Sequence, residues 1–118
     1  MESILNTIKK MLGIPEEYEV FDSDIIIHIN SVFSILKQLG VGPKNGYMIT
    51  DKSNTWDEFF DGIDISRKDI NQVESYIYLR VKLLFDPPNN SSLESYKELI
   101  KEFEYRMYVT TDNNVGGE

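Results

Sequence analysis

Apolar residues are densest in residues 76–88, whose sequence is YIYLRVKLLFDPP. On a helical wheel, at about 100° per residue, four aliphatic residues lie within roughly 40° of Ile77: Ile70, Val73, Val81 and Leu84. Aromatic and aliphatic neighbours widen this face on both sides, and Leu79 lies almost opposite. A helix that is apolar nearly all round must be covered from several directions. The pattern therefore predicts either the central helix of a small bundle or a helix that another chain partly covers.

Helical periodicity predicts two helices before this stretch. The first follows Ser3 as its cap, ends at Gly13, and places its apolar residues at Ile4, Leu5, Ile8, Met11 and Leu12. The second opens at Asp22 or Ser23, ends at Gly40, and carries Ile25, Ile26, Ile29, Val32, Phe33, Leu36 and Leu39. Three consecutive isoleucines would also suit a strand, but the spacing and the two end signals favour a helix.

The segment after the second helix carries turn signals and then a short aromatic helix. Residues 41–53 contain the turn dipeptides Gly-Pro and Asn-Gly. Thr55 and Glu58 have the spacing of a capping box, and Gly62 ends the short helix that bears Trp56, Phe59 and Phe60. Trp56 has two interpretations: a core residue, or an anchor between subunits, because tryptophan is enriched at binding hot spots.

Two further helices and a tail complete the predicted fold. Ser66 with Asp69 caps the helix that runs through residues 76–85, and Asp86-Pro87-Pro88 ends it. Ser91 with Glu94 then starts a last helix, whose apolar stripe consists of Leu93, Tyr96, Leu99, Ile100, Phe103 and Met107. Residues 110–118 have one aliphatic residue and no periodicity, so alone they should be disordered unless a neighbouring chain holds them.

These elements predict an all-α fold. It is a small helical bundle of four main helices plus one short aromatic-rich helix, with a long loop after helix two and an extended C-terminal tail. At 118 residues the chain is one domain, which we place at residues 1–109, with the tail at 110–118. We expect no membrane-spanning helix, because no run of about 20 apolar residues occurs. The first 13 residues do not have the pattern of a signal peptide.

Charge narrows the function classes. The formal net charge is −8, and no basic stripe of the kind that neutralises nucleic-acid phosphates is visible. The longest stretch of one sign is acidic and has no Lys or Arg between its members: Glu16, Glu17, Glu19, Asp22 and Asp24. It is either a solvated loop and helix start, a patch for a basic partner, or a surface that repels DNA.

The residue types needed for catalysis, metal or cofactor binding do not occur in a suitable arrangement. With His28 as the single histidine and no cysteine, the usual triads and a zinc site are excluded. Asp57 and Asp61 share helical spacing but would need more oxygen ligands to hold a cation. Gly46 is followed by Tyr47 and Met48, so a phosphate-binding loop fails. We therefore expect no catalytic, metal or cofactor residues. The missing cysteines fit a reducing compartment.

Several stretches together resemble a known family. Residues 76–88, followed by NNSSLESYKELIKEFEYRM, resemble the head–tail connector (adaptor) proteins of tailed phages and prophages of Gram-positive bacteria, also described as head-completion or DNA-packaging proteins. Residues 28–43, HINSVFSILKQLGVGP, and then GYMITD with the Trp56 helix agree in order. The resemblance covers residues 4–108. Tyr105 departs from it, because a tryptophan is expected before the arginine.

The resemblance implies a structural virion protein without enzymatic activity. Such proteins form a ring beneath the portal at one capsid vertex, join head to tail and extend the DNA channel. The implied partners are other copies of the chain in an expected dodecamer, the portal protein, a stopper or tail completion protein, and double-stranded DNA that passes without sequence-specific binding. The implied location is the head–tail junction of the virion, after synthesis in the bacterial host cytoplasm. A small helix-turn-helix DNA-binding regulator is the alternative, although it would need a basic recognition helix.

We predict that a few residues contact a neighbouring subunit or the portal. Tyr76, Tyr78 and Leu79 are the residues of the central helix that the other predicted helices leave uncovered. Arg80, at the border of the apolar face, either extends past the core to solvent or pairs with an acid from another helix or chain. The remaining candidates are Trp56 and, in the tail, Val115.

Overall fold

The computed structural model describes the backbone of residues 2–61 and 67–116, with side chains for 2–61 and 70–109. Within these ranges the chain forms five helices: α1 (Ile4–Met11), α2 (Asp22–Gln38), α3 (Trp56–Phe59), α4 (Arg67–Phe85) and α5 (Asn90–Gly116). The described residues contain no strand, only one isolated bridge between Ser3 and Thr55. The predicted all-α fold is confirmed.

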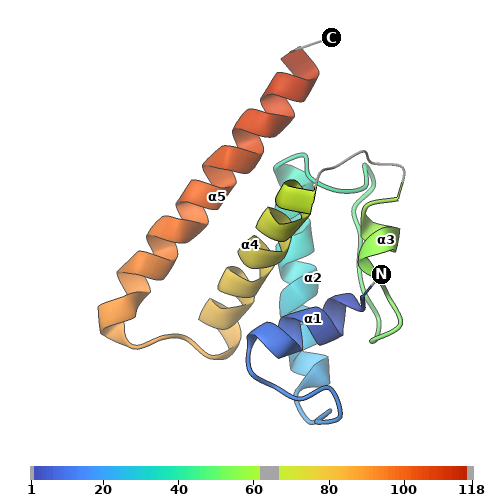
Figure 1. Cartoon of the computed structure of the whole chain (residues 1–118), viewed down its shortest axis with the longest axis vertical. Coiled ribbons are helices and arrows are strands. Elements are labelled where there is room, and N and C mark those ends of the chain that lie inside the picture. The colour runs from blue at the N-terminus through green and yellow to red at the C-terminus, as the bar shows by residue number, and fades with distance from the viewer. Residues whose placement is uncertain (1, 62–66, 117–118) are drawn as a thin grey trace.

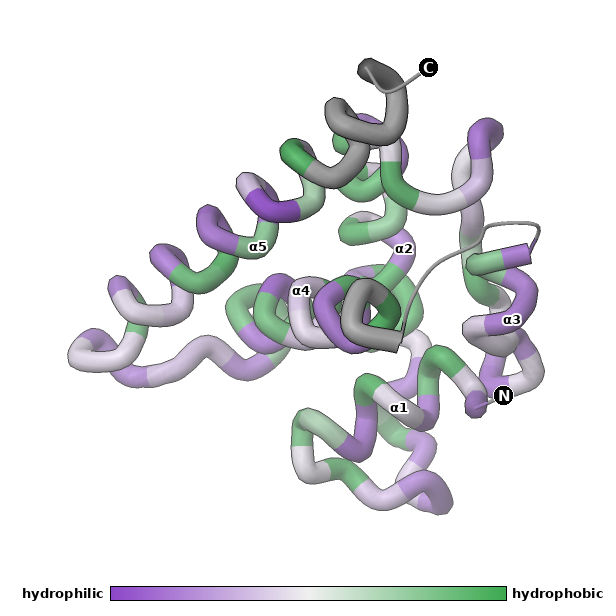
Figure 2. The backbone as a smooth tube through the Cα atoms, turned by 45° about the horizontal axis from the view of Figure 1, so that its top comes forward, coloured by the Kyte–Doolittle hydropathy of each residue, from purple (hydrophilic) through white to green (hydrophobic). Residues whose placement is uncertain are grey.

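The helices surround α4. In Figure 1, α2 and α4 run antiparallel through the middle, α1 crosses them near one end, and α5 returns along the outside of α4. The short α3 lies on the side away from α5. Hydrophobic segments of α2 and α4 lie where these helices meet, whereas α5 alternates between hydrophobic and hydrophilic positions (Figure 2). The helix with apolar residues nearly all round is thus covered from several directions by its own chain.

The predicted apolar stripes form one core. Buried residues come from every helix: Ile4, Leu5 and Ile8 from α1; Ile25, Ile29, Val32, Phe33 and Leu36 from α2; Trp56 and Phe59 from α3; Ile70, Val73, Tyr76, Ile77, Leu79 and Val81 from α4; Ile100 and Met107 from α5. Burying a large aliphatic or aromatic side chain contributes about 1.5 to 3 kcal/mol relative to exposure. Packing of these stripes therefore supplies most of the stability of the helices.

A side chain of α2 fixes the long loop that carries α3. The Asn30 amide donates to the Ile49 carbonyl at 3.0 Å and accepts from the Ile49 amide at 2.8 Å. The Asn30 side chain thus bonds both backbone groups of Ile49, as the backbone of a neighbouring strand would. On α3, the indole of Trp56 donates to the Thr7 hydroxyl at 3.0 Å. The loop therefore cannot slide along the core, and α3 is bonded to α1.

Most predicted helix ends are confirmed. The Ser3 hydroxyl accepts from the Asn6 amide at 3.2 Å, Thr55 and Glu58 form a capping box, and Gly13 and Gly40 have φ of 82° and 81°. The start of α5 is corrected: Asn89, not Ser91, supplies the cap, because its Oδ1 accepts from the Ser92 amide at 3.1 Å. Asparagine caps as well as serine does, so the helix begins directly after the prolines. Predictions for Gly62 and Ser66 and for the Asp69 side chain lie outside the described residues.

The C-terminal segment differs from the prediction. Residues 110–116 are not an extended tail but continue α5 to Gly116. The prediction of an extended tail was wrong because it considered the composition of these residues apart from the helix that precedes them. A helix that is already formed adds one hydrogen bond for each residue it gains, without a new nucleation cost.

Gly42 should be the glycine least tolerant of substitution. Its φ is 96°, and an added Cβ would lie 2.6 Å from the ring of Phe59. Gly13 has a similar φ but nothing within 4 Å of an added Cβ, so it is the matched control. We expect Gly13→Ala to lower the free energy of unfolding by about 1 kcal/mol through backbone strain, and Gly42→Ala by about 2 to 4 kcal/mol through strain and overpacking. Urea unfolding measures both, and equal losses would contradict the close packing on Phe59.

Candidate functional site

Three of the predicted interface residues are not on the surface. Trp56 is 1% exposed, Tyr76 0% and Leu79 7%, all within the chain's own core. The core interpretation of Trp56 is therefore confirmed. The interpretation of Tyr76 and Leu79 as uncovered residues was wrong, because α5 covers a side of α4 that the wheel left open. Leu79 consequently belongs to the core that holds the monomer together.

A polar network joins α4 to α5 beside this core. The Arg80 guanidinium lies 2.5 Å from Glu104 Oε2, and Tyr76 donates its hydroxyl hydrogen to the same oxygen at 2.7 Å. Arg80 Nε also donates to the Tyr76 hydroxyl at 2.7 Å, and its guanidinium carbon lies 5.5 Å from the centre of the Tyr76 ring. Pairing of Arg80 with an acid from another helix is thus confirmed, and that helix is α5 of the same chain.

The network shifts the pKa values of Glu104 and Tyr76. Burial tends to raise the pKa of Glu104, but hydrogen bonds from Arg80 and then Tyr76 outweigh it and hold the pKa below its ordinary value. Burial, followed by the hydrogen bond to Glu104, raises the pKa of Tyr76 far above that of a free tyrosine. At neutral pH the network is therefore a carboxylate, a guanidinium and a neutral phenol, which satisfies each group.

The other two predicted interface residues lie nearer the surface or beyond the described side chains. Tyr78 is half-buried, and burial together with the nearby Tyr96 raises its pKa. Val115 lies on the α5 backbone, but its side chain is outside the described residues. Tyr78 and Arg80 are thus the two candidates with partly exposed side chains in the described part of the chain.

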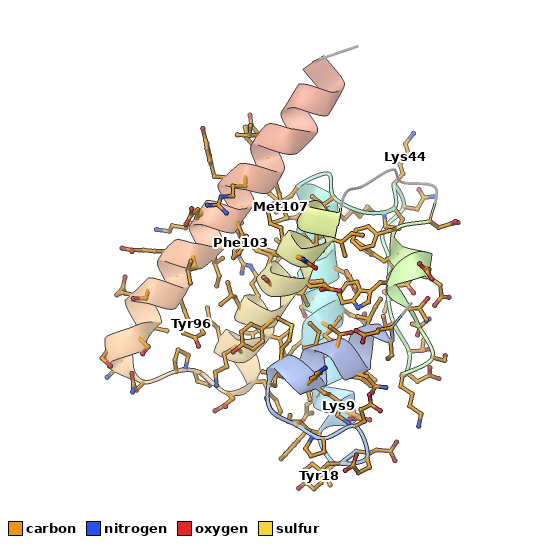
Figure 3. The ribbon with its side chains drawn as sticks, viewed as in Figure 1. Lys9, Tyr18, Lys44, Tyr96, Phe103 and Met107 are labelled. Atoms are coloured by element: carbon orange, nitrogen blue, oxygen red, sulfur yellow. The ribbon has the colours of Figure 1, made fainter. Side chains whose placement is uncertain are left out.

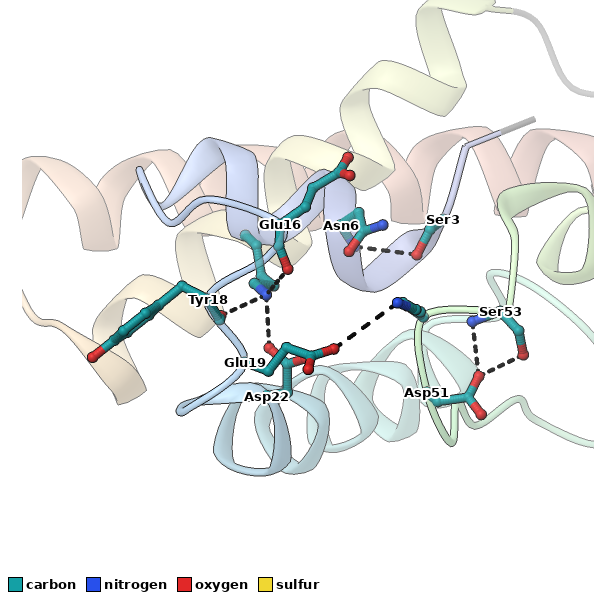
Figure 4. A network of polar contacts seen from close by, with 10 residues as sticks. Ser3, Asn6, Glu16, Tyr18, Glu19, Asp22, Asp51 and Ser53 are labelled. Carbon is teal, nitrogen blue, oxygen red and sulfur yellow. Dashed lines mark hydrogen bonds and ion pairs between the residues drawn. The ribbon is translucent and has the colours of Figure 1, made fainter.

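A feature that the pattern analysis missed is the complete burial of Lys9. This α1 side chain is 0% exposed, and its Nζ donates to the Glu16 carbonyl at 2.9 Å and the Tyr18 carbonyl at 2.8 Å. Asp22 Oδ1 lies 2.8 Å from Nζ, off the hydrogen-bonding direction, and forms an ion pair (Figure 4). Two of the three N–H donors of Lys9 thus bind backbone carbonyls, and the Asp22 carboxylate balances the charge. One sequence signal was available: Lys9 follows Leu5 by four residues and so extends the apolar face of α1.

Lys9 shapes the loop between α1 and α2, and this loop presents charged and aromatic side chains. We call residues 16–21 the acidic loop. Glu16, Glu17 and Glu19 line a shallow depression with Asn6 and Lys52. The Tyr18 side chain points to the opposite side of the loop from the Glu19–Lys52 contact (Figure 4). All six residues of the loop are exposed. The charge pattern grouped Asp22 with these acids, but its carboxylate forms an ion pair with Lys9.

Aromatic contacts continue from the acidic loop to the end of α4. The Tyr18 and Phe21 rings lie 5.7 Å apart, and the Phe21 and Phe85 rings lie 5.2 Å apart, both edge to face. His28 adjoins Phe85 at 6.5 Å between ring centres. Phe21 and Tyr18 nevertheless remain partly exposed, and Val20 is 69% exposed. The loop therefore offers apolar contact area next to its carboxylates.

Two negative findings apply to the described residues. Among them, no three His, Asp or Glu side chains lie close enough together to hold a metal ion. None of the helices, as far as the structure describes them, has the length and hydrophobicity needed to span a bilayer.

The comparisons with known proteins match this helical chain to one family. A model of the family described as phage connector protein matches residues 4–114. The chain belongs to the phage connector protein family. No curated protein and no solved structure matches it. The resemblance noted in the sequence is confirmed, and the match extends past Tyr108 into the last turns of α5.

Membership of the phage connector protein family indicates what the surfaces of this chain are used for in general. Connectors are virion proteins that associate with the portal and other head–tail proteins, so surfaces for contact with other proteins are the features of interest. In this connector, all five helices contribute to the core, α5 packs along α4, and the acidic loop protrudes at one end (Figure 3). Tyr76 and Arg80 of α4 hold α5 in place through Glu104.

The acid stability of this connector should depend on Glu104. Its pKa is lower in the folded than in the unfolded state, so its contribution to stability is complete above the unfolded value, near 4.3, and is lost as the pH falls through the folded value. We expect Glu104→Gln to lower stability at neutral pH and to flatten the loss between about pH 5 and pH 3. Urea midpoints across this range measure it. The exposed Glu98→Gln should keep the wild-type profile, and identical profiles for all three proteins would contradict the role of Glu104.

Lys9 should contribute more to stability than any exposed lysine. Lys9→Met keeps most of the apolar stem of the side chain but leaves the Asp22 carboxylate and two carbonyls without their partner. We expect a loss of about 3 to 5 kcal/mol in the free energy of unfolding. The exposed neighbour Lys10→Met should change it by less than about 0.5 kcal/mol. Chemical denaturation compares the two, and a small loss for Lys9→Met would show that water replaces the ammonium group at this site.

Proposed function

We propose that this connector forms a ring beneath the portal at one capsid vertex, where it joins head to tail and extends the DNA channel. The observation that carries the proposal is the family match over residues 4–114. The proposed partners are further copies of the chain, the portal protein and a stopper or tail completion protein. Twelve copies are expected, following the portal. The proposed site of action is the head–tail junction of the virion.

The surface of the chain supports an assembly role. Large apolar side chains remain exposed on several elements: Tyr18 and Val20 in the acidic loop, Ile27 on α2, Met48 in the long loop, and Leu99, Tyr105 and Tyr108 on α5. Scattered apolar residues are normal on a monomer, but these are concentrated on the protruding loop and the outer helix. Contacts with neighbouring proteins would remove them from water.

The charge of the chain supports passage of DNA rather than binding. A net charge of −8 disfavours adhesion of a duplex to the channel wall. In the part of α4 whose side chains are described, Arg80 pairs with Glu104 and Lys82 pairs with Asp86 at 2.9 Å, so these two cations are engaged within the chain. A helix-turn-helix regulator needs such cations free for phosphates, and no observation favours that alternative.

Tyr78, Arg80 and Val115 are proposed as contacts in this assembly. Tyr78 and Arg80 have partly exposed side chains beside α5, and Val115 lies in its last turns. Because α5 reaches furthest from the core, its end is suited to contact a neighbouring subunit or the portal (Figure 1).

Electron microscopy of the purified chain with the portal protein of the same phage tests the function. We expect a ring on one end of the portal, with native mass spectrometry giving the number of copies. A variant that lacks residues 110–118 should keep the wild-type melting temperature but fail to join the ring. If the full chain and the portal stay separate in both measurements, the proposed function is wrong. If the shortened chain assembles normally, only the role of the α5 end is wrong.

A further inference from the structure

The geometry of a ring demands two different surfaces on each subunit, and this inference rests on the ring that we propose. In a closed ring of more than two copies, every contact is heterologous: one patch of a subunit meets a different patch of the next. The two patches must therefore be complementary to each other, and both must be exposed in the single chain. Complementary charge and apolar area are the properties to look for.

The acidic loop has the properties of one such patch. The side chains of Glu16, Glu17 and Glu19 are exposed there, and Lys52 lies 3.9 Å from Glu19 with both side chains about two-thirds exposed. Such a surface pair neutralises little. Tyr18 and Val20 add exposed apolar area. Because Lys9 fixes the backbone of this loop, little conformational freedom would be lost when it binds.

The opposite end of α2 has the complementary properties. Lys37 in its last turn and Lys44 in the following loop are exposed, and neither makes an ion pair within the described part of the chain. The stem of Lys37 lies against Gly46, where an added Cβ would be 3.2 Å from its Cδ. Met48, two residues further on, is 69% exposed. We call Lys37, Lys44 and Met48 the basic end.

We propose that the acidic loop of one copy docks on the basic end of the next copy. Carboxylates would meet the two lysines, and Tyr18 and Val20 would meet Met48. Tyr18 and Lys44 lie beyond opposite ends of α2 (Figure 3), so about the length of that helix separates them, roughly 25 Å for its 17 residues. Since the two patches do not overlap, one subunit can use both at once, as a ring requires.

Charge reversal tests this pairing. One variant carries Glu16→Lys with Glu17→Lys, and the other carries Lys37→Glu with Lys44→Glu. All four side chains are exposed, so circular dichroism and melting temperature should match the wild type. Each variant alone places like charges at every subunit contact. We expect neither to form rings on the portal, and assembly of the wild type to weaken as salt rises.

An equimolar mixture of the two variants gives the decisive result. In an alternating ring, each reversed patch meets a patch of the opposite sign, so the mixture should assemble into rings that contain both variants in equal number. The matched control mixes the Glu16/Glu17 variant with Lys97→Glu/Lys101→Glu, whose substitutions reverse two exposed lysines of α5 instead. That mixture should form rings that exclude the Glu16/Glu17 variant. Native mass spectrometry distinguishes the compositions.

The outcomes separate this proposal from the proposed function. If the wild type forms rings but the first mixture does not, or if either variant assembles alone, the pairing of the acidic loop with the basic end is wrong and the ring stands. If the control mixture incorporates the Glu16/Glu17 variant equally well, the basic end is not its partner. If the wild type forms no ring with the portal, the proposed function itself fails.

Discussion

The burial of α4 on more than one side is the constraint on which the fold depends. Its Ile77 face needs α1 and α2, and its Tyr76 face needs α5. Neither cover suffices alone, because the uncovered side would expose a row of large apolar side chains. The two covers differ in kind. The first is almost entirely apolar, whereas the second adds the shared carboxylate of Glu104, whose hydrogen bonds from Tyr76 and Arg80 fix the position of α5 along α4. A purely apolar contact would hold α5 but would define its register less sharply.

Sequence periodicity predicted this architecture because helical stripes and end signals are local. The apolar stripe of α2, the capping box at Thr55 and the stop at Pro87 depend on residues within a turn or two, and the structure confirms them. The burial of Leu79 could not be predicted in the same way, because it depends on where α5 returns. That path is set by a four-residue connection between Phe85 and Asn90 and by contacts between residues far apart in the chain.

The surfaces were harder to predict than the core. Charge counting grouped Asp22 with the other acids, yet its carboxylate belongs to a buried pair. Trp56, which as a residue type suggested an interface anchor, and Tyr76, which the predicted helices left uncovered, are core residues, and each finds a polar partner inside the chain. Some of the residues that remain available for contacts, such as Val20 and Met48, lie in loops, where periodicity gives no information. Their identification required the three-dimensional arrangement.

The way in which Lys9 holds the acidic loop has a consequence for how such a surface can evolve. Its ammonium group binds the carbonyl oxygens of Glu16 and Tyr18, which every amino acid possesses, and not their side chains. Substitutions at these two positions therefore leave the anchoring of the loop intact. The side chains that the loop displays can therefore change independently of the shape of its backbone. A lineage can exchange the chemistry of this surface, and with it the molecule that the surface fits, without rebuilding the scaffold beneath.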